Sequence, residues 1–332
     1  MESIYTTTGI KAEADRIEKD SVHVFAPATV ANMVCGFDVL GFALNEPGDE
    51  VIMCKADRQG VHIVNITGDD GRLPREAAKN TVSASVMSFL QYIDRTDVGV
   101  EIELHKQMPI GSGLGSSAAS TVAGLFAINT LLGSPLSRQE LLPFAIQGEE
   151  LACGHGHADN VAPSLLGGIT LIRGYDPLDV VALPVPSELY TSVVFPYVDV
   201  PTRDARQMIR AKVALKDAVI QWGNIAGLVA GLFTSDYHLI GRSMQDVLIE
   251  PTRAILIPEF YEMRRLAMEA GALGFGISGS GPSVFAFAQS KDIATHITSV
   301  VQAHLAGQGI DSNGYVSGIN TEGPKEIQGR EE

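Results

Sequence analysis

A glycine-rich segment between a predicted strand and an alanine-rich predicted helix constrains the fold of this chain more than any other feature. Residues 98–106 (VGVEIELHK) alternate apolar and polar side chains, as a half-exposed strand does. Residues 109–120 (PIGSGLGSSAAS) follow, and a helix is predicted to begin at the paired serines Ser116 and Ser117. Glycines allow a tight turn that brings backbone N–H groups together, and a helix start adds unpaired amides and a positive dipole end. The segment therefore predicts an anion site, in which the serine hydroxyls can bind a phosphate oxygen or a metal.

The net charge of the chain makes such a local device necessary. Asp and Glu outnumber Lys and Arg by 39 to 24, which gives a formal charge of −15. A surface of this sign repels nucleic acid and anionic membranes at long range, so we expect neither as a partner. A small polyanion has to be held by oriented amides, which need no positive surface.

Two common phosphate loops do not match the segment. A P-loop ends in Gly-Lys-Ser/Thr, and no lysine lies in residues 109–120. A dinucleotide-binding fingerprint needs glycine where Ser116 stands, which argues against a dehydrogenase. A turn that only lets the helix pack closely is the structural alternative.

Cysteine usage and hydropathy indicate a cytoplasmic protein. Cys35, Cys54 and Cys153 lie far apart with no CxxC pair, as expected for free thiols in a reducing compartment. No apolar run reaches the roughly 18 residues of a membrane helix. Residues 1–20 are polar and are expected to form an extension.

Hydrophobic periodicity and turn residues predict an α+β fold in two parts. Strands and helices are interspersed throughout, with Asn80 as the N-cap of one helix and Pro258 in the first turn of another. We expect an extension at 1–20, an N-terminal domain at 21–175, a C-terminal domain at 176–321 and a frayed tail at 322–332.

Three motifs resemble those of the GHMP kinases (galacto-, homoserine, mevalonate and phosphomevalonate kinases). Residues 109–119 resemble the signature loop PxGxGLGSSAA, residues 27–41 (PATVANMVCGFDVLG) resemble the first motif, and residues 274–282 (GFGISGSGP) resemble the third. Segments 148–168, 201–206 and 246–260 resemble homoserine kinases in particular. The resemblance spans most of the chain, and it implies ATP-dependent phosphorylation of the L-homoserine hydroxyl in threonine biosynthesis.

The resemblance also implies a fold and a nucleotide site. The fold is an N-terminal domain like domain 2 of ribosomal protein S5, followed by a ferredoxin-like domain, with ATP bound between them. Asn80 is a candidate adenine contact by position. Homodimers occur in the family, although the sequence identifies no interface. The residues implied to bind ATP in the signature loop are Pro109, Ile110, Gly111, Ser112, Gly113, Leu114, Gly115, Ser116, Ser117, Ala118 and Ala119.

Homoserine is a zwitterion, so its site needs opposite charges at two ends. The resemblance places Asp38 and Asn32 at the ammonium end, and Arg206 and Arg253 at the carboxylate end. The planar guanidinium suits bidentate carboxylate binding. An uncharged sugar would not require this arrangement.

The resemblance assigns Ser116 and Glu149 to a magnesium ion, whose preferred ligands are oxygens. Glu150 is adjacent, and spacing alone does not separate it from Glu149. Asp159 lies where some GHMP kinases have a catalytic base. Homoserine kinases are thought to need none, with Asn160 orienting the hydroxyl, and we favour this second hypothesis. A transition-metal site at His155 and His157 is disfavoured because the expected ion prefers oxygen.

Departures from the family pattern occur at two places. Residues 33–35 (Met-Val-Cys) replace the usual Leu-Gly-Pro, and Glu259 replaces a glycine. Cys35 is expected beside the substrate pocket, which predicts inactivation by thiol alkylation that homoserine slows. The alternatives are a mevalonate- or shikimate-type kinase, or a non-catalytic ligand sensor of the same fold.

Overall fold

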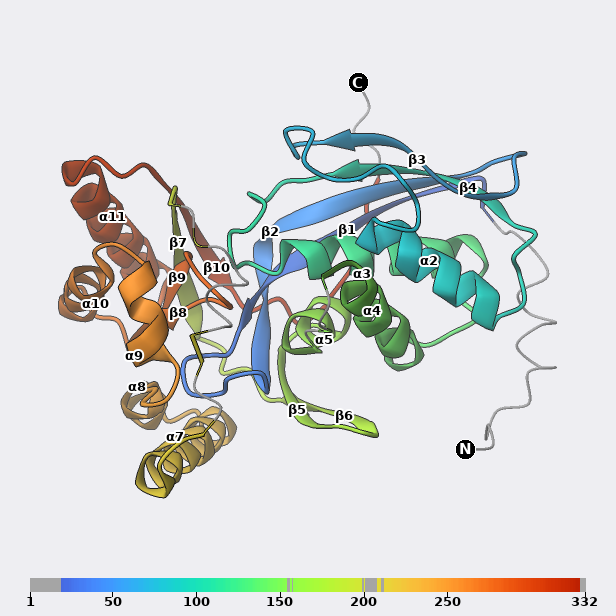
Figure 1. Cartoon of the computed structure of the whole chain (residues 1–332). Helices are drawn as coiled ribbons and strands as arrows, with labels where there is room; N and C mark the ends of the chain where they lie inside the picture. Colours follow the sequence, from blue (N-terminus) through green and yellow to red (C-terminus); the bar gives the residue numbers. More distant parts are fainter. Residues whose placement is uncertain are drawn as a thin grey trace.

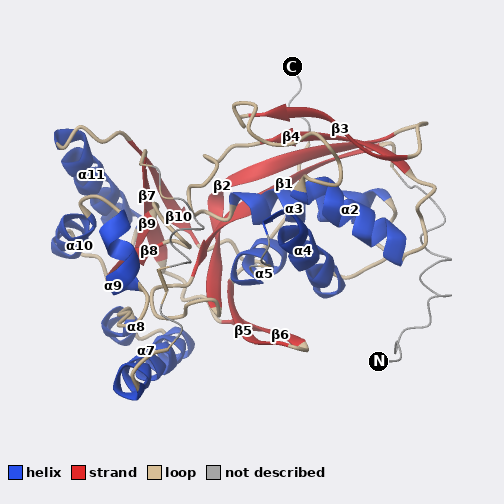
Figure 2. Ribbon diagram, in the orientation of Figure 1, coloured by secondary structure: helices blue, strands red, loops and turns tan. Residues whose placement is uncertain are grey.

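The computed structural model describes residues 19–153, 156, 158–198, 200, 208–209 and 212–328. Within them the chain forms two sheets, each carrying helices on one face (Figure 1). The larger sheet is built mainly from the N-terminal half and the smaller from the C-terminal half, as the sequence colouring in Figure 1 shows, and Figure 2 marks the strands of both sheets in red. The expected α+β fold in two parts is confirmed.

The larger sheet has the strand order β11-β1-β2-β4-β3, with β5 and β6 extending from β2. Its neighbouring strands are antiparallel except for β3 and β4, which are parallel and are joined through α2. Apolar residues alternate toward the core along β4, as its sequence pattern predicted. The strands are β1 (Ser21–Ala31), β2 (Leu40–Lys55), β3 (Gly60–Thr67), β4 (Gly99–His105), β5 (Ile169–Tyr175), β6 (Leu178–Leu183) and β11 (Lys325–Glu326).

Four helices pack on one face of this sheet: α2 (Thr81–Tyr92), α3 (Ser116–Leu131), α4 (Arg138–Cys153) and α5 (Ala158–Leu166). Helix α3 is apolar and buried around most of its circumference because β1, β2, α2 and α4 surround it. Asn80 caps α2 as predicted, accepting a hydrogen bond from the backbone N–H of Val82. Helix α4 begins with a capping box, in which Glu140 accepts the N–H of Ser137.

The smaller sheet is antiparallel with the order β10-β7-β9-β8. Counted along the chain this is 4-1-3-2 in a β-α-β-β-α-β arrangement, which is the ferredoxin-like order that was expected. Its strands are β7 (Tyr190–Pro196), β8 (Gly274–Ile277), β9 (Val284–Ala288) and β10 (Ser312–Gly318). Its helical segments are α7 (Leu215–Thr234), α8 (Tyr237–Ser243), α9 (Glu250–Arg253), η1 (Ala254–Leu256), α10 (Phe260–Glu269) and α11 (Lys291–Gly307).

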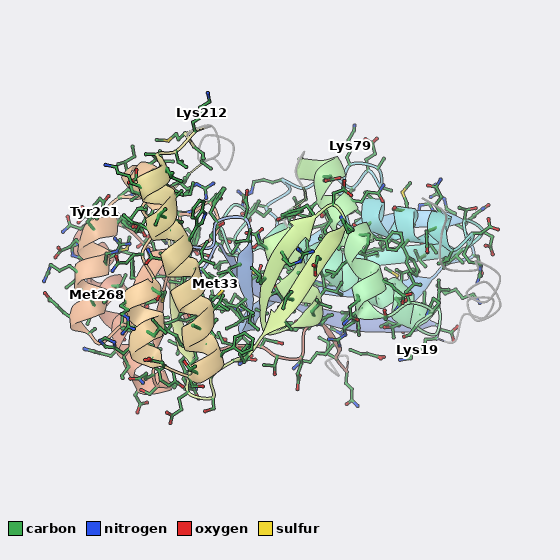
Figure 3. All side chains as sticks on the ribbon, turned by 90° about the horizontal axis from the view of Figure 1, so that it is seen from below. Lys19, Met33, Lys79, Lys212, Tyr261 and Met268 are labelled. Carbon is green, nitrogen blue, oxygen red and sulfur yellow. The ribbon has the colours of Figure 1, made fainter. Side chains whose placement is uncertain are left out.

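The two sheets share one apolar core where they meet. The ring of Phe42 on β2 lies 5.0 Å from Phe287 and 5.7 Å from Phe285, both on β9. Met33, in the turn after β1, is fully buried and lies between the two halves (Figure 3). Because this contact is apolar and close-packed, it fixes the two halves around the site described below.

Several expectations about boundaries need correction. The predicted division at 175/176 stays a prediction; it lies in the turn between β5 and β6, and the larger sheet continues to Leu183 before β7 begins at Tyr190. The tail was expected to fray from 322 onward, but Lys325 and Glu326 pair with the edge strand β1. Helix α10 begins at Phe260 after a left-handed Glu259, so Pro258 is not in its first turn. Residues 201–207 lie outside the described part of the chain.

Candidate active site

The glycine-rich loop has the conformation that its composition predicted. Gly111, Gly113 and Gly115 have φ values of +77°, +80° and +63°, a region that glycine enters without strain. A Cβ at Gly115 would lie 2.0 Å from the Thr29 hydroxyl oxygen, whereas one at Gly111 would meet nothing within 4 Å. At position 115 a side chain would collide with Thr29, so glycine is required for space. At position 111 there is space for a side chain, and glycine is favoured only by the positive φ.

The three motifs found in the sequence meet at this loop. From the first motif, the Thr29 N–H donates to the Leu114 carbonyl at 3.0 Å. From the third, the Ser278 hydroxyl donates to the Gly113 carbonyl at 2.7 Å, and just after that motif the Ser283 N–H donates to the Ser112 carbonyl at 3.2 Å. Motifs more than a hundred residues apart thus hold the loop from both sides.

The loop and the start of α3 fit an anion. Gly115 at the N-cap has no side chain to satisfy the first amides, and the first turn of α3 carries no acidic residue. The Ser112 hydroxyl is buried and has no hydrogen-bond partner among the described residues. A buried hydroxyl without a partner is costly, and a phosphate oxygen would satisfy it.

A cavity of about 770 Å³ adjoins the loop and reaches from α2 to the turn after β1. This volume suits a nucleotide with a small second substrate. At the α2 end, both polar atoms of the Asn80 amide are already engaged: Oδ1 accepts from Val82 and Nδ2 donates to the Pro74 carbonyl at 2.9 Å. Its assignment as an adenine contact stays a prediction. Among the residues that line the cavity are Asn32, Asp38, Asn80, Lys106, Ser112, Ser116, Ser117, Glu149, Asp159, Asn160, Arg253 and Gly279.

The predicted substrate residues gather at the other end of the cavity. Asn32 accepts the Asp38 N–H at 3.0 Å and donates to the Gly279 carbonyl at 2.8 Å. Arg253 donates to the same carbonyl at 3.0 Å, and its guanidinium lies 5.0 Å from the centre of the Phe37 ring. A carboxylate and a guanidinium therefore line one cavity, as a zwitterion requires. Arg206 lies outside the described residues.

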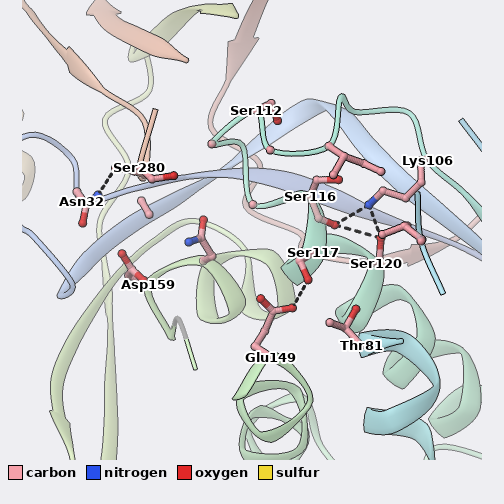
Figure 4. Close-up of a pocket in the computed structure, with 18 of the residues that line it drawn as sticks. Asn32, Thr81, Lys106, Ser112, Ser116, Ser117, Ser120, Glu149, Asp159 and Ser280 are labelled. Carbon is pink, nitrogen blue, oxygen red and sulfur yellow. Dashed lines mark hydrogen bonds between the residues drawn. The ribbon is translucent and has the colours of Figure 1, made fainter. Parts of the chain in front are cut away.

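Asp159 and Asn160 enter the cavity from the first turn of α5. The Asp159 side chain is buried, and Asn160 accepts the Thr29 hydroxyl at 2.8 Å. Figure 4 shows Asp159 on the side of Asn32 and Ser280, with Glu149 toward Ser117. His155 and His157 lie outside the described residues.

Glu149, the residue that the resemblance assigns to the metal, is buried, whereas its neighbour Glu150 is exposed. One oxygen of Glu149 accepts the hydroxyls of Ser117 at 2.6 Å and Thr121 at 3.2 Å. Burial raises the pKa of Glu149 above its ordinary value, although these hydroxyls and the charge of Lys106 act in the opposite direction.

The two serines at the start of α3 face different ways. The Ser117 hydroxyl contacts Glu149, whereas the Ser116 hydroxyl lies 3.3 Å from a carboxylate oxygen of Asp49. The structure thus brings Ser117 to Glu149, where the sequence had suggested Ser116. Within the described residues, no cluster of three Asp, Glu, His or Cys side chains is positioned to bind a metal. One carboxylate with nearby hydroxyls suits magnesium, which also binds waters and phosphate oxygens.

Sequence reasoning missed Lys106 and Asp49, which form a buried ion pair behind the loop. Lys106 directly precedes the loop, so a search for phosphate-binding lysines on both sides of it would have found this residue. Asp49 lies 57 residues earlier, on β2, and carries no such signal. The loop itself holds no lysine, as stated, but a lysine lines the cavity beside it.

The prediction about Cys35 is wrong. Its side chain is 1 % exposed and is not among the residues that line the cavity. Burial, with a smaller contribution from the charge of Asp246, raises the pKa of Cys35 to about 12. Since the thiolate is the reactive form, alkylation of the folded protein is expected to be very slow.

Comparison with known proteins gives this site a family. The model of the GHMP kinase N-terminal domain matches residues 80–168, and the model of the GHMP kinase C-terminal domain matches residues 228–307. A homoserine kinase from Chlorobium phaeobacteroides (strain BS1) is 48 % identical over 91 % of this chain and 98 % of its own length. The chain belongs to the GHMP kinase family.

Other similar proteins support the same family assignment. A homoserine kinase from Chloroherpeton thalassium is 51 % identical over 84 % of this chain and 90 % of its own. The crystal structure of homoserine kinase from Cytophaga hutchinsonii matches with a TM-score of 0.92 and 56 % identity, covering 94 % of this chain and 99 % of that one. Mevalonate kinase from L. major shares the fold, with a TM-score of 0.71 and 16 % identity. The match covers 92 % of this chain and 98 % of that one. The predicted family and its two-part fold are confirmed.

No helix in the described part of this GHMP kinase combines the length and the hydrophobicity that a membrane crossing requires.

Proposed function

We propose that this GHMP kinase transfers the γ-phosphoryl group of ATP to the side-chain hydroxyl of L-homoserine, a step of threonine biosynthesis. The observation that carries the proposal is that one cavity is lined both by the glycine-rich loop and by Asp38 and Arg253. The relatives named homoserine kinase, at 48 % and 51 % identity, support the same substrate.

The loop binds the triphosphate through its backbone amides and the Ser112 hydroxyl. The positive end of α3 stabilises the charge that develops on the transferred group. Glu149 and Ser117 would hold Mg²⁺, with Ser116 in the arrangement that the family resemblance implies, and the bound ion would neutralise charge on the phosphate oxygens.

Side chains at the other end orient homoserine. Asp38 accepts hydrogen bonds from the ammonium group, while Arg253, and Arg206 by resemblance, bind the carboxylate. Because the Asn32 amide already joins Asp38 to the third motif, it fixes the position of the ammonium site. Anchoring both ends of the substrate leaves its hydroxyl facing the phosphate loop, which is the positioning that phosphoryl transfer needs.

We propose that Asn160 orients the hydroxyl and that no side chain acts as a general base, the γ-phosphate taking the proton. Asp159→Asn tests this point because the change keeps the size of the side chain. Turnover within about tenfold of the wild type is expected. A loss of several orders of magnitude at unchanged homoserine affinity would assign Asp159 as the base instead.

The substrate is tested by measuring ATP turnover with Mg²⁺ on L-homoserine, mevalonate, shikimate and galactose. Turnover on homoserine alone is expected, and Asp38→Asn should lower it while leaving ADP affinity unchanged. Turnover on an uncharged alcohol in preference to homoserine would refute the proposal. ATP binding without any turnover would favour the ligand-sensor alternative.

We also propose a cytosolic location, supported by the free thiols of Cys35 and Cys54. A homodimer and a two-domain division at 175/176 complete the proposal. The oligomeric state can be measured by light scattering coupled to gel filtration.

A further inference from the structure

A buried ion pair lies behind the phosphate loop and has no part in the mechanism above. The side chains of Lys106 and Asp49 form a direct ion pair and are 3 % and 0 % exposed. Lys106 lines the cavity, whereas Asp49 lies behind it. A buried pair is costly to desolvate and contributes little net stability, so its presence here calls for another role.

Hydrogen bonds from this pair converge on the first turn of α3. The Lys106 ammonium donates to Asp49, to the Ser116 carbonyl at 2.9 Å and to the Ser120 hydroxyl at 2.6 Å (Figure 4). Its three donors are thus all directed at protein acceptors. Lys106 is therefore already committed before any phosphate arrives.

Asp49 binds the same turn. One of its oxygens accepts the hydroxyls of Ser120 at 2.7 Å and Ser116 at 3.3 Å, and the other accepts the Gln107 N–H at 3.0 Å. Asp49 lies on β2 and Lys106 follows β4, which is the neighbour of β2 in the sheet. The pair consequently ties the start of α3, and with it the phosphate loop, to two strands.

The negative charge of Asp49 and the positive charge of Lys106 act in opposite directions on a bound nucleotide. A carboxylate just behind a phosphate site repels a nucleotide, because a few ångströms of low-dielectric protein screen charge poorly. Lys106 forms a direct ion pair with this carboxylate, and its positive charge offsets the repulsion between the carboxylate and the nucleotide.

We propose that Asp49 is a positioning residue that fixes the first turn of α3, and that Lys106 neutralises its carboxylate so that the loop accepts a nucleotide. Neither residue contacts the reacting atoms. The inference rests on the proposed function: the charge relation requires that the cavity bind a nucleotide, and the positioning role requires that ATP be turned over there.

Calorimetric titration with ADP in the absence of divalent metal tests the charge relation. Lys106→Met leaves the carboxylate uncompensated and should weaken ADP binding at least tenfold. The double variant Asp49→Asn/Lys106→Met removes both charges and should return to within about threefold of the wild type. Lys55→Met is the matched control, since it removes the same charge from the exposed far end of β2 and should change nothing.

Asp49→Asn alone tests the positioning role. The retained Lys106 charge should leave ADP binding equal to or tighter than in the wild type, while kcat falls about tenfold because the Ser116 turn has lost its charged acceptor. The ATP KM should not rise. A pair that only supports the fold predicts a different result, in which affinity follows the melting temperature.

The outcomes are separable. If the double variant binds ADP as weakly as Lys106→Met, or if Asp49→Asn binds more weakly than the double variant at equal melting temperature, the inference is overturned. Should Lys106→Met fail to fold, the comparison of Asp49→Asn with the double variant still decides, since these two differ only in the lysine charge. A wild-type protein that binds no ADP would instead overturn the proposed function.

Discussion

The two ends of the cavity achieve tight turns by different means. At the phosphate end, the left-handed positions are glycines: Gly111, Gly113 and Gly115. In the turn after β1, at the substrate end, they are residues with side chains, namely Asn32 (φ +73°), Met33 (+42°), Val34 (+66°) and Asp38 (+60°). Non-glycine residues in this region are strained by about 1–3 kcal/mol each.

The difference follows from what each end recognises. A phosphate can be bound by backbone amides, so a loop without side chains suffices and carries little strain. An amino acid zwitterion needs a carboxylate and an amide at fixed places, so Asn32 and Asp38 must keep their side chains where the chain turns sharply. The substrate end accepts strain because its chemistry lies in side chains.

Glu149→Gln should have the largest effect, and it concerns the phosphate end. Turnover with Mg²⁺ should fall about 1,000-fold, since the carboxylate proposed to hold the ion is lost. The stability of the folded protein should increase in this variant, although its turnover falls. Burial raises the pKa of Glu149, so ionisation destabilises the fold as the pH rises above the ordinary Glu pKa of 4.5.

The Gln variant should therefore melt about 2 °C higher than the wild type at pH 8 without metal, and show no advantage below pH 4.5. Glu150→Gln is the matched control, because that neighbour is exposed. A Glu149→Gln enzyme with normal Mg²⁺-dependent turnover would rule out the proposed ligand.

Gly115→Ala tests whether the glycines of the phosphate end serve close approach. Its methyl group would meet the Thr29 hydroxyl and the Asn160 amide, at 2.0 and 2.8 Å. We expect kcat/KM for ATP to fall about 100- to 1,000-fold, the range for a disrupted oxyanion site. Gly111→Ala has a similar φ and open space, so its loss should be about tenfold or less. Equal losses in both variants would show that φ alone matters.

Arg253→Lys tests the substrate end. The guanidinium binds the Gly279 carbonyl and lies against Phe37, a geometry that an ammonium does not reproduce. The kcat/KM for homoserine should fall about 100-fold, with ADP affinity unchanged. Arg265→Lys is the control, since Arg265 is an exposed partner of Glu262 and Glu269 and its pairs contribute little. If Arg253→Lys lowered ADP affinity as much as kcat/KM for homoserine, nucleotide binding and substrate binding would depend on the same residue.

Val34→Gly should have the smallest effect, and it makes the substrate end resemble the phosphate end. The change relieves the left-handed strain of a β-branched residue but removes a buried side chain that packs against Gly276. Val34→Ala loses the same packing without the relief. The Gly variant should be more stable than the Ala variant by about 1 kcal/mol in urea unfolding, with activity within twofold. An Ala variant more stable than the Gly variant would show that the backbone at Val34 is not strained.

Local features of the site could be read from the sequence because they depend on neighbours along the chain. The glycine loop, the cap at Asn80 and the capping box at Ser137 each need only a few adjacent residues in the right order. The family motifs extended this to residues far apart, since the resemblance placed Asn32, Asp38 and Arg253 at one pocket. Cys35 shows the limit: its place within the first motif did not reveal that the residue is buried in the core.

The sequence by itself determined the strand-loop-helix unit, the α+β composition and the family. Only the tertiary structure decided which serine faces Glu149, that β6 and β11 join the larger sheet, and that Asp49 meets Lys106. The physical reason is that turn and helix preferences act over a few residues. Pairing across a sheet and burial of a charge depend on which distant surfaces pack together.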